Sequence, residues 1–333
     1  MEILLGKRKH FFKANLHCHS TESDGRRSVE ELKEEYKKRG YSIVAFTDHE
    51  HLLDHSYLND EDFLTITSCE LAVKEFPNES SLKNRDMRVA HLNFYALDPH
   101  NTVTPCYASA YDHYVRDDNR DRVRFEGEYE RVYGAEGINA MIREGNERGF
   151  LVSYNHPSWS LEDAEEYLRY EGCFAVEIYN HSCVMSGHPD DERVFADMLR
   201  AGKRVYCTAA DDNHNSMDFT APGGDSFGGF VKIDADALEY GEIMRALAAG
   251  EFYASSGPEI YSLTREGDTV RIQTSSARSI HLLTRGRRTE KAFAVGADGL
   301  TEARFTLRDT DGIFRLRVED ERGKRAYTQA YPV

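Results

Sequence analysis

The sequence predicts a β/α barrel followed by a small β-rich domain, on two observations. Up to residue 257, apolar strand-like segments rich in β-branched residues alternate with amphipathic helical segments, which is typical of a parallel sheet covered by helices. Beyond Gly257-Pro258 the pattern changes to short alternating segments separated by turns, which is typical of a small β-sandwich. A chain of 333 residues is long enough for a barrel of about 250 residues plus such a domain. We therefore expect two domains, 1–257 and 258–333.

The first predicted strand, 10–17, runs into a loop that carries His17, His19 and Asp24. Because side chains alternate along a strand, His17 and His19 point to the same side, where two imidazoles can bind one metal ion. Asp24 follows on the loop and can turn back over the same position. A helix is expected to begin at Ser28, since Ser-Val-Glu-Glu is a capping-box pattern.

Later strands and helices continue the alternation. Strands are expected at 42–47, 63–71, 89–97, 150–154, 174–179 and 204–209, and helices at 135–148, from 160 onwards, at 191–199 and at 237–249. Residues of metal-ligand type lie near the C-terminal ends of these strands: His49, Glu70, His91, His156, Asp212 and His214. Because the C-terminal ends of barrel strands meet on one face, we expect these side chains to converge there.

Two segments interrupt the alternation. Residues 74–88 are polar and mixed in charge, so we expect a surface insertion. Residues 98–134 lack regular periodicity and are rich in Asp, Arg and Tyr. They form either a solvated excursion or helical subdomain on the barrel rim, or a lid that supplies Arg or Tyr to a substrate.

Composition and charge disfavour several classes of protein. The formal net charge of −16 disfavours long nucleic acids as partners, because phosphate neutralisation needs a concentrated basic surface. No apolar run approaches the roughly 18 residues of a membrane span. Six cysteines occur without a Cys-x-x-Cys pair, so we expect free thiols in a reducing compartment. We expect a soluble cytoplasmic protein without a membrane partner, and the sequence leaves its oligomeric state open.

Nine residues form the predicted set of metal ligands: His17, His19, Asp24, His49, Glu70, His91, His156, Asp212 and His214. Imidazoles and carboxylates without thiolates suit Zn, Mn or Fe, and a glutamate among several histidines can bridge two ions. The other histidines, including His51 and His55, lack this placement at strand ends and are expected at the surface.

Several of these motifs resemble, in order and spacing, those of the polymerase and histidinol phosphatase (PHP) family. They are His17-x-His19 with Asp24, Thr47-Asp48-His49, Glu70, His156-Pro157 and Asp212-x-His214. The resemblance covers roughly residues 10–257. It implies a distorted seven-stranded β/α barrel and a metal-dependent hydrolase, since members of this family are mostly phosphoesterases with up to three metal ions.

The resemblance also implies how the ligands are shared. His17, His19, Glu70 and Asp212 would hold the first ion; Glu70, His91 and His156 the second; and Asp24, His49 and His214 the third. Many relatives have His where this chain has Asp24. Asp48 would orient a ligand histidine rather than bind a metal ion. The β-rich tail resembles that of a subgroup whose relatives include enzymes that cleave carbamate esters.

The predicted function is hydrolysis of a small phosphomonoester or phosphodiester with two to three divalent ions. Glu70 and Asp212 would position a hydroxide that bridges two ions, and no separate protein base is then needed. Arg85 and Arg88 are the predicted substrate-binding residues, which would neutralise phosphoryl oxygens. Two alternatives remain: hydrolysis of a carboxylic or carbamate ester at the same site, and a catalytically silent metal-binding or ligand-binding module.

Overall fold

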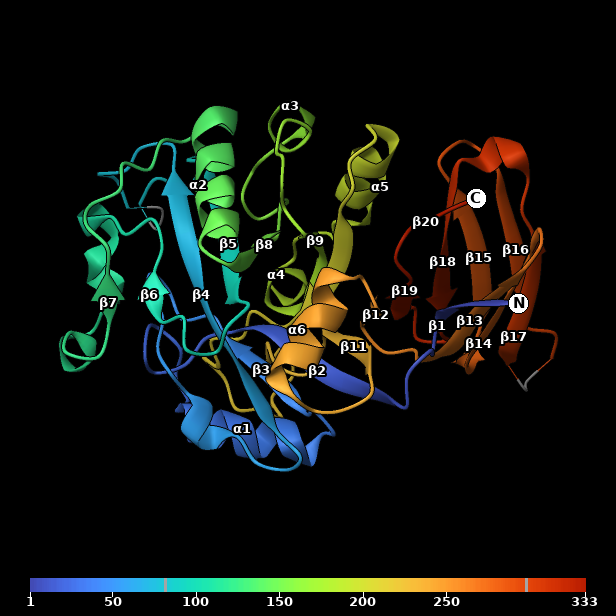
Figure 1. Ribbon diagram of the computed structural model, residues 1–333, viewed down its shortest axis with the longest axis horizontal. Coiled ribbons are helices and arrows are strands. Elements are labelled where there is room, and N and C mark those ends of the chain that lie inside the picture. Colours follow the sequence, from blue (N-terminus) through green and yellow to red (C-terminus); the bar gives the residue numbers. More distant parts are fainter. Residues whose placement is uncertain (81–82, 297–298) are drawn as a thin grey trace.

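The computed structural model describes residues 1–80, 83–296 and 299–333 and has a mixed α/β fold. Helices surround the strands of the larger part, and a β-rich part lies beside it (Figure 1). The larger part contains the strands β2 (His10–Cys18), β3 (Ile43–Phe46), β4 (Leu64–Lys74), β5 (Val89–Ala96), β8 (Phe150–Tyr154), β9 (Ala175–Asn180), β10 (Tyr206–Ala210), β11 (Phe230–Ala235) and β12 (Phe252–Ser255). Its helices are α1 (Val29–Lys38), α2 (Ala135–Glu147), α3 (Ala164–Tyr167), α4 (His181–Met185), α5 (Glu192–Arg200) and α6 (Tyr240–Ala248).

Seven strands of the larger part follow one another in the order β10-β9-β8-β5-β4-β3-β2. β2, β3 and β4 are parallel, and so are β8, β9 and β10, but β5 runs antiparallel to both of its neighbours. At the two ends of this order, Asp212 N donates a hydrogen bond to His17 O (2.8 Å) and His19 N donates one to Asn213 O (3.1 Å). The chain segment after β10 therefore returns to the end of β2.

Local sequence signals explain where α1 begins. The Ser28 hydroxyl accepts a hydrogen bond from Glu31 N, and the Glu31 carboxylate accepts one from Ser28 N, so the predicted capping box is confirmed. The predicted starts of two later helices were wrong. Asp163, not Ser160, caps α3, and α6 follows Glu239. At α3 the carboxylate of Asp163 accepts from Glu165 N, a local bond that outweighs the Ser160 signal.

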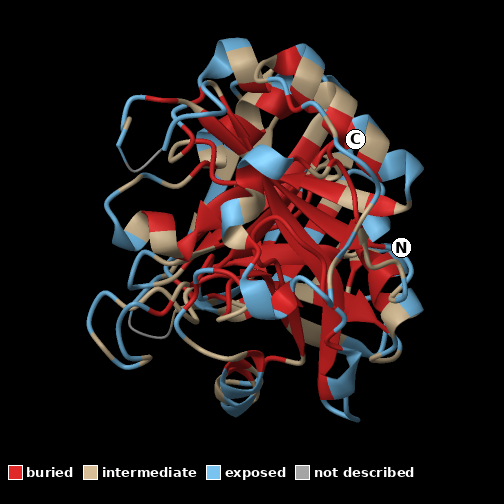
Figure 2. Ribbon diagram, turned by 90° about the vertical axis from the view of Figure 1, so that its left-hand side faces the viewer, coloured by how far each residue is buried: buried red, intermediate tan, exposed pale blue. Residues whose placement is uncertain are grey.

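The strands of the larger part form its buried centre, and the helices carry the exposed outer faces (Figure 2). Every residue of β3 and of β4 is buried, which agrees with the expected burial on both faces. β11 and β12 were not expected. They extend the sheet beyond β2 as antiparallel strands and lead into the β-rich part.

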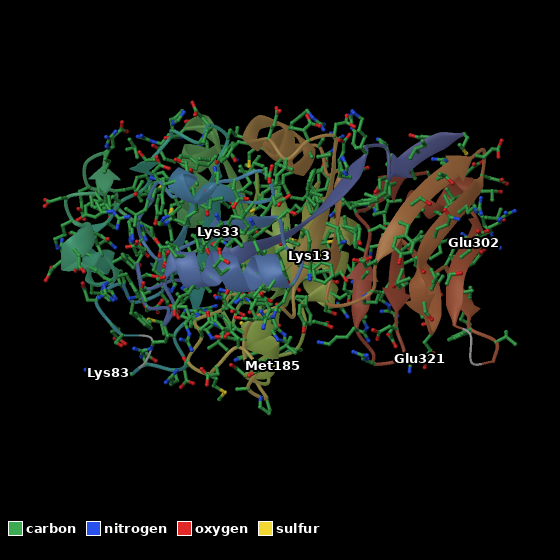
Figure 3. All side chains as sticks on the ribbon, turned by 90° about the horizontal axis from the view of Figure 1, so that it is seen from below. Lys13, Lys33, Lys83, Met185, Glu302 and Glu321 are labelled. Atoms are coloured by element: carbon green, nitrogen blue, oxygen red, sulfur yellow. The ribbon has the colours of Figure 1, made fainter. Side chains whose placement is uncertain are left out.

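Two sheets that share one apolar core make up the β-rich part. Its strands are β1 (Glu2–Leu5), β13 (Ile260–Glu266), β14 (Thr269–Ala277), β15 (Ser279–Thr284), β16 (Thr289–Phe293), β17 (Leu300–Thr306), β18 (Ile313–Glu319), β19 (Arg325–Tyr327) and β20 (Tyr331–Pro332). One sheet has the order β1-β13-β14-β17, and in the other β19, β18, β15 and β16 continue from β12. Figure 3 shows Glu302 and Glu321 on this part and Lys83 at the other end of the molecule.

The first strand of the chain belongs to this β-rich part, because β1 pairs with β13. Leu5 of β1 is fully buried and packs in the same cluster as Leu263 of β13. No local sequence pattern predicts this pairing. The division into 1–257 and 258–333 remains a prediction, and β1 lies with the strands that follow residue 257.

The segment 98–134 contains only short elements: β6 (Val103–Thr104), η2 (Ser109–Tyr114), η3 (Asp117–Asn119) and β7 (Arg124–Phe125). A buried ion pair ties it to the larger part, since Arg131 Nη1 lies 2.7 Å from the Glu50 carboxylate. Arg131 also donates to Ala72 O of β4 (2.8 Å) and to Cys106 O (2.9 Å). All six cysteines are free and buried. Within the described ranges, the helices are too short or too polar to cross a membrane.

Candidate metal centre

The nine residues predicted as metal ligands lie together at one rim of the seven strands. His17 is in β2, with His19 and Asp24 in the loop that follows it. The others are His49 after β3, Glu70 in β4, His91 in β5, His156 after β8, and Asp212 and His214 after β10. Their ligand atoms fall into three overlapping groups with members within 4.8 Å of one another: His17, His19, Glu70 and Asp212; Glu70, His91 and His156; His19, Asp24, His49 and His214. These groups correspond to the three predicted ligand sets, with His19 added to the third.

Glu70 lies at the centre of the cluster, and five imidazoles surround its carboxylate. Distances from Oε1 are 3.2 Å to His17 Nε2, 3.1 Å to His91 Nδ1 and 3.3 Å to His156 Nε2, and those from Oε2 are 3.4 Å to His19 Nε2 and 3.2 Å to His49 Nδ1. The side chain is 1% exposed. Burial alone would raise the pKa of Glu70, but His91 and His17 hold it well below its ordinary value. Glu70 therefore stays an anion.

Asp212 completes the deepest group. Its Oδ1 lies 3.1 Å from His17 Nε2 and 3.0 Å from His19 Nε2, and these two nitrogens are themselves 3.2 Å apart. Burial would lower the pKa of His19, but the neighbouring carboxylates of Asp212 and Glu70 raise it to about 10. Without a metal ion, the negative charges of Asp212 and Glu70 must therefore be balanced by protons on the buried imidazoles around them.

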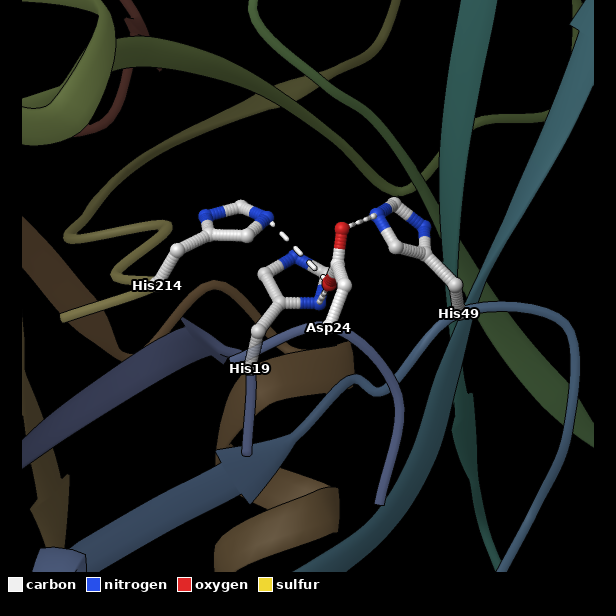
Figure 4. Close-up of side chains that lie close together, drawn as sticks. All are labelled: His19, Asp24, His49 and His214. Carbon is white, nitrogen blue, oxygen red and sulfur yellow. Dashed lines mark ion pairs between the residues drawn. The ribbon is translucent and has the colours of Figure 1, made fainter. Parts of the chain in front are cut away.

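The outermost group consists of His19, Asp24, His49 and His214 (Figure 4). Asp24 is 41% exposed at its side chain, and its oxygens lie 3.8 Å from His49 Nε2 and 3.5 Å from His214 Nε2. The Nδ1 atom of His19 lies 4.0 Å from Asp24 Oδ1. Burial and the neighbouring His19 lower the pKa of His49 to about 3, so this imidazole is neutral and free to bind a metal ion.

The side chains of the cluster leave some of their polar atoms without hydrogen bonds, as expected for metal ligands. Three buried atoms of the cluster have no hydrogen-bond partner among the described residues: His19 Nδ1, His49 Nδ1 and Glu70 Oε2. A buried polar atom without a partner calls for an explanation, and a bound metal ion would supply one for these three. Uncharged imidazoles and carboxylates in overlapping groups are the donors that Zn, Mn or Fe prefers.

Asp48 contacts the loop that carries two predicted ligands, and its role in orienting a ligand histidine remains a prediction. Its carboxylate contacts Ser20 and Ser23, accepting hydrogen bonds from the backbone N and the hydroxyl of each (2.6–3.2 Å). Asp48 therefore fixes the loop that carries His19 and Asp24. Asp48 follows β3, and the loop after β2 lies over this end of β3. The N–H and hydroxyl groups of Ser20 and Ser23 therefore meet the carboxylate of Asp48.

A carboxylate that holds a ligand histidine is Glu177 of β9, which sequence reasoning missed. Its Oε1 lies 3.1 Å from His17 Nδ1, and its Oε2 accepts hydrogen bonds from His156 N (3.1 Å) and Asn180 Nδ2 (2.8 Å). Such a contact fixes the tautomer and the orientation of an imidazole. A signal was present in the sequence, since Glu177 is a single carboxylate inside the apolar segment Phe174–Tyr179.

Two amide side chains also hold the carboxylates of the cluster. Asn155 Nδ2 donates to Glu70 Oε1 (2.8 Å), and Asn180 Nδ2 donates to Asp212 Oδ2 (3.0 Å). His156 and Asp212 themselves have positive φ angles of 27° and 54°, which side chains other than glycine seldom adopt. Backbone strain of this kind is often found at functional sites.

Two ligands do not lie at the strand ends where they were expected. β4 continues to Lys74, so Glu70 is inside the strand rather than beyond it. His91 is near the N-terminal end of β5. Because β5 is antiparallel to β4, its N-terminal end reaches the same rim as the C-terminal ends of the parallel strands. The expectation that His51 and His55 lie at the surface is also wrong, since both are buried.

A cavity of about 800 Å³ opens over the cluster. Tyr114 of the segment 98–134 lines it, with its ring 4.5 Å from that of His49, so this segment reaches the cavity as the lid hypothesis expects. Arg88 pairs with Glu75 and Glu166 instead. Arg85 is exposed, and neither arginine lines the cavity. Arg85 and Arg88 are therefore not placed where the predicted role in substrate binding requires them.

Gly25 allows the loop to close on the cluster. A Cβ at this position would lie 2.7 Å from the carbonyl C and O of His19, so we expect Gly25→Ala to displace the loop and lower metal content. Elemental analysis of both proteins after loading with Mn or Zn measures this. Gly241→Ala is the matched control, because a Cβ there meets no atom within 4 Å. Equal metal content in wild type and Gly25→Ala would show that this close approach is not needed.

No family model matches the chain, and no curated protein matches it. Among solved structures, a two-domain protein from Bacteroides vulgatus with a predicted PHP-like metal-dependent phosphoesterase has 14% identity and a TM-score of 0.48, with 100% of this chain and 98% of that chain covered. A protein from Bifidobacterium adolescentis assigned as a metal-dependent phosphoesterase has 14% identity and a TM-score of 0.37, with 68% and 93% covered. An amidohydrolase from Chromobacterium violaceum with bound sulfate and no metal has 13% identity and a TM-score of 0.38, with 72% and 96% covered.

Proposed function

We propose that the chain is a metal-dependent hydrolase of the PHP type that cleaves a small phosphomonoester or phosphodiester. The observation that carries the proposal is the convergence of nine imidazole and carboxylate side chains into three groups. Glu70 belongs to two of these groups, and so does His19. We also infer that the seven strands from β2 to β10 close into a barrel, which the hydrogen bonds between Asp212 and His17 and between His19 and Asn213 support.

Two or three divalent ions, Zn, Mn or Fe, would be held in these groups. The first would have His17, His19, Glu70 and Asp212 as ligands; the second Glu70, His91 and His156; the third Asp24, His49 and His214. Bound ions would lower the pKa of a coordinated water and withdraw charge from the ester oxygens. Glu70 and Asp212 carry the negative charge that offsets the ions, and a small anionic substrate is then compatible with a chain of net charge −16.

The residues around the ligands have their own part in the proposed reaction. Glu177 holds His17 and the backbone of His156 in place, and Asn155 fixes the rotamer of Glu70. Trp159 lies against His91 and His156, with ring centroids 5.1 Å and 5.0 Å away. Tyr114 lies against His49, so Trp159 and Tyr114 give the cavity an aromatic surface near the ligands against which the organic part of an ester could pack.

The test combines a metal count with a substrate panel. Protein purified without chelator is expected to contain at least two ions per chain and to hydrolyse p-nitrophenyl phosphate or bis-(p-nitrophenyl) phosphate, with Asp212→Asn as the blank. Turnover of p-nitrophenyl acetate or a carbamate ester alone, lost in Asp212→Asn, would replace the phosphoesterase by a carbon-ester hydrolase. Less than one ion per chain after reconstitution with Mn or Zn would contradict both.

A further inference from the structure

The cavity continues well beyond the proposed metal ligands, along β4. Glu70, Ala72 and Lys74 alternate on the same face of this strand, and all three line the cavity. On β5, His91 is paired with Ala72, and Val89 with Lys74. A strand advances by about 3.3 Å per residue, so the backbone of Lys74 lies roughly 13 Å from that of Glu70. The cavity therefore has a metal-ligand end and a far end at Lys74.

Lys74 is a buried cation without an anionic partner. It is 6% exposed, yet no carboxylate oxygen of the described residues lies within 4 Å of its ammonium group, and no hydrogen bond from Nζ is formed among them. The ammonium lies 4.9 Å from the centre of the Tyr111 ring. Burial lowers the pKa of Lys74. The ammonium group of Lys74 faces the cavity without a paired anion, so an anionic ligand would stabilise this end of the cavity.

A second basic residue lines the cavity. Arg116 is exposed and makes no ion pair with the described residues, and its position beside Tyr114 puts it on the segment 98–134. His113 of the same segment also lines the cavity. The one acidic side chain among the lining residues outside the metal centre is Glu79, whose carboxylate accepts a hydrogen bond from Asn84 Nδ2 (2.7 Å). Lys74 thus makes the far end of the cavity cationic, and Arg116 adds a second positive charge to the cavity wall.

We propose that Lys74 binds a second anionic group of the substrate, a carboxylate or phosphate held roughly 10 Å from the ester that is cleaved. The substrate would then have an ester at the metal end, a middle that packs against Tyr114 and Trp159, and an anion at the far end. The identity of the cleaved ester rests on the proposed function. Lys74 is a specificity-determining residue in this arrangement, because it recognises a group that does not react.

Substrates of graded length test this proposal. The metal-loaded protein is assayed with n-alkyl phosphates of two to ten carbons, with the α,ω-bisphosphates of the same chains, and with ω-carboxyalkyl phosphates. We expect kcat/KM to favour a doubly anionic substrate over its singly charged counterpart by on the order of 10- to 100-fold, within one window of length, because a hydrogen bond between charged groups contributes about this factor. The two anionic series distinguish a phosphate from a carboxylate at the far end.

Variants assign this preference to Lys74. Lys74→Met is expected to reduce the ratio between doubly and singly charged substrates to below threefold, and Lys74→Arg to retain most of it, with metal content equal to wild type in both. Lys13→Met is the matched control, because Lys13 also lies over an aromatic ring, 3.9 Å from the centre of Tyr41, but is not among the residues that line the cavity. A ratio near one at every length, or one that survives in Lys74→Met, would overturn the proposal and leave the phosphoesterase intact.

A binding measurement keeps the two proposals separate. Calorimetry with alkane-α,ω-bisphosphonates and alkyl monophosphonates needs no turnover, so it reports on Lys74 even when no phosphate ester is hydrolysed. Tighter binding of the bisphosphonate that is lost in Lys74→Met supports the role of Lys74, whatever reaction the metal centre performs. Equal affinity of wild type and Lys74→Met for the bisphosphonate contradicts it.

Discussion

Glu70→Gln is expected to reduce kcat/KM for the best ester substrate by on the order of 1000-fold and to remove at least one metal ion per chain. The reason is the central position of this carboxylate, whose two oxygens lie within 3.4 Å of five imidazoles. An amide lacks the charge that offsets two ions, and its NH2 group would face histidine nitrogens. Elemental analysis and steady-state kinetics on the same preparation measure both effects.

Asp24→Ala is the comparison for Glu70→Gln. Asp24 is 41% exposed at its side chain and its oxygens lie 3.5 Å or more from the histidines around it, so we expect a smaller loss of activity and at most one ion lost. Equal losses in the two variants, or full metal content in Glu70→Gln, would show that Glu70 is not shared between ions.

Arg131→Met is expected to lower the free energy of unfolding by about 3–5 kcal/mol, because it leaves the carboxylate of Glu50 buried without its counter-ion. The side chains of Arg131 and Glu50 are 1% and 3% exposed. Arg131 also satisfies Ala72 O and Cys106 O, which the methionine cannot do. Denaturant unfolding followed by tryptophan fluorescence measures the change, since the single Trp159 lies in the cavity wall.

The double variant Glu50→Gln/Arg131→Met separates the loss of the cation from the loss of packing. Removing the charge of Glu50 as well should recover roughly 1–2 kcal/mol of the destabilisation. Lys38→Met, which removes an exposed partner of Glu35, is the surface control and should have little effect. A double variant that is less stable than Arg131→Met would mean that the carboxylate of Glu50 does not depend on the arginine.

Local signals in the sequence were enough to predict α1 and the burial of β3, because a capping box and a run of β-branched residues act within a few residues. The nine candidate ligands could be found for a similar reason, since their residue types recur at the ends of apolar segments. Their metal binding remains a prediction. Strand direction is a different matter, because nothing within 89–97 encodes that β5 is antiparallel to β4.

Residues whose role depends on distant partners could not be assigned from the sequence. Lys74 was counted with a polar insertion, but β4 carries it into the cavity, where its ammonium group has no carboxylate partner among the described residues. Glu177 was passed over as part of a strand, although its partners His17 and His156 come from β2 and from the turn after β8. Arg88 is predicted to bind substrate, but Glu75 and Glu166 neutralise it. For Glu177 and Arg88, the deciding contacts join residues that are far apart in the sequence.

The pairing of β1 with β13 has a consequence for synthesis on the ribosome. β1 is translated well before its partner, which begins at Ile260. At about 5–20 residues per second, the roughly 250 intervening residues take about 12–50 s to be made. During that interval β1 has an unpaired edge and an uncovered Leu5, which makes it a site where a nascent chain can aggregate or recruit a chaperone. The synthesis of β13 therefore sets the earliest time at which β1 can be paired.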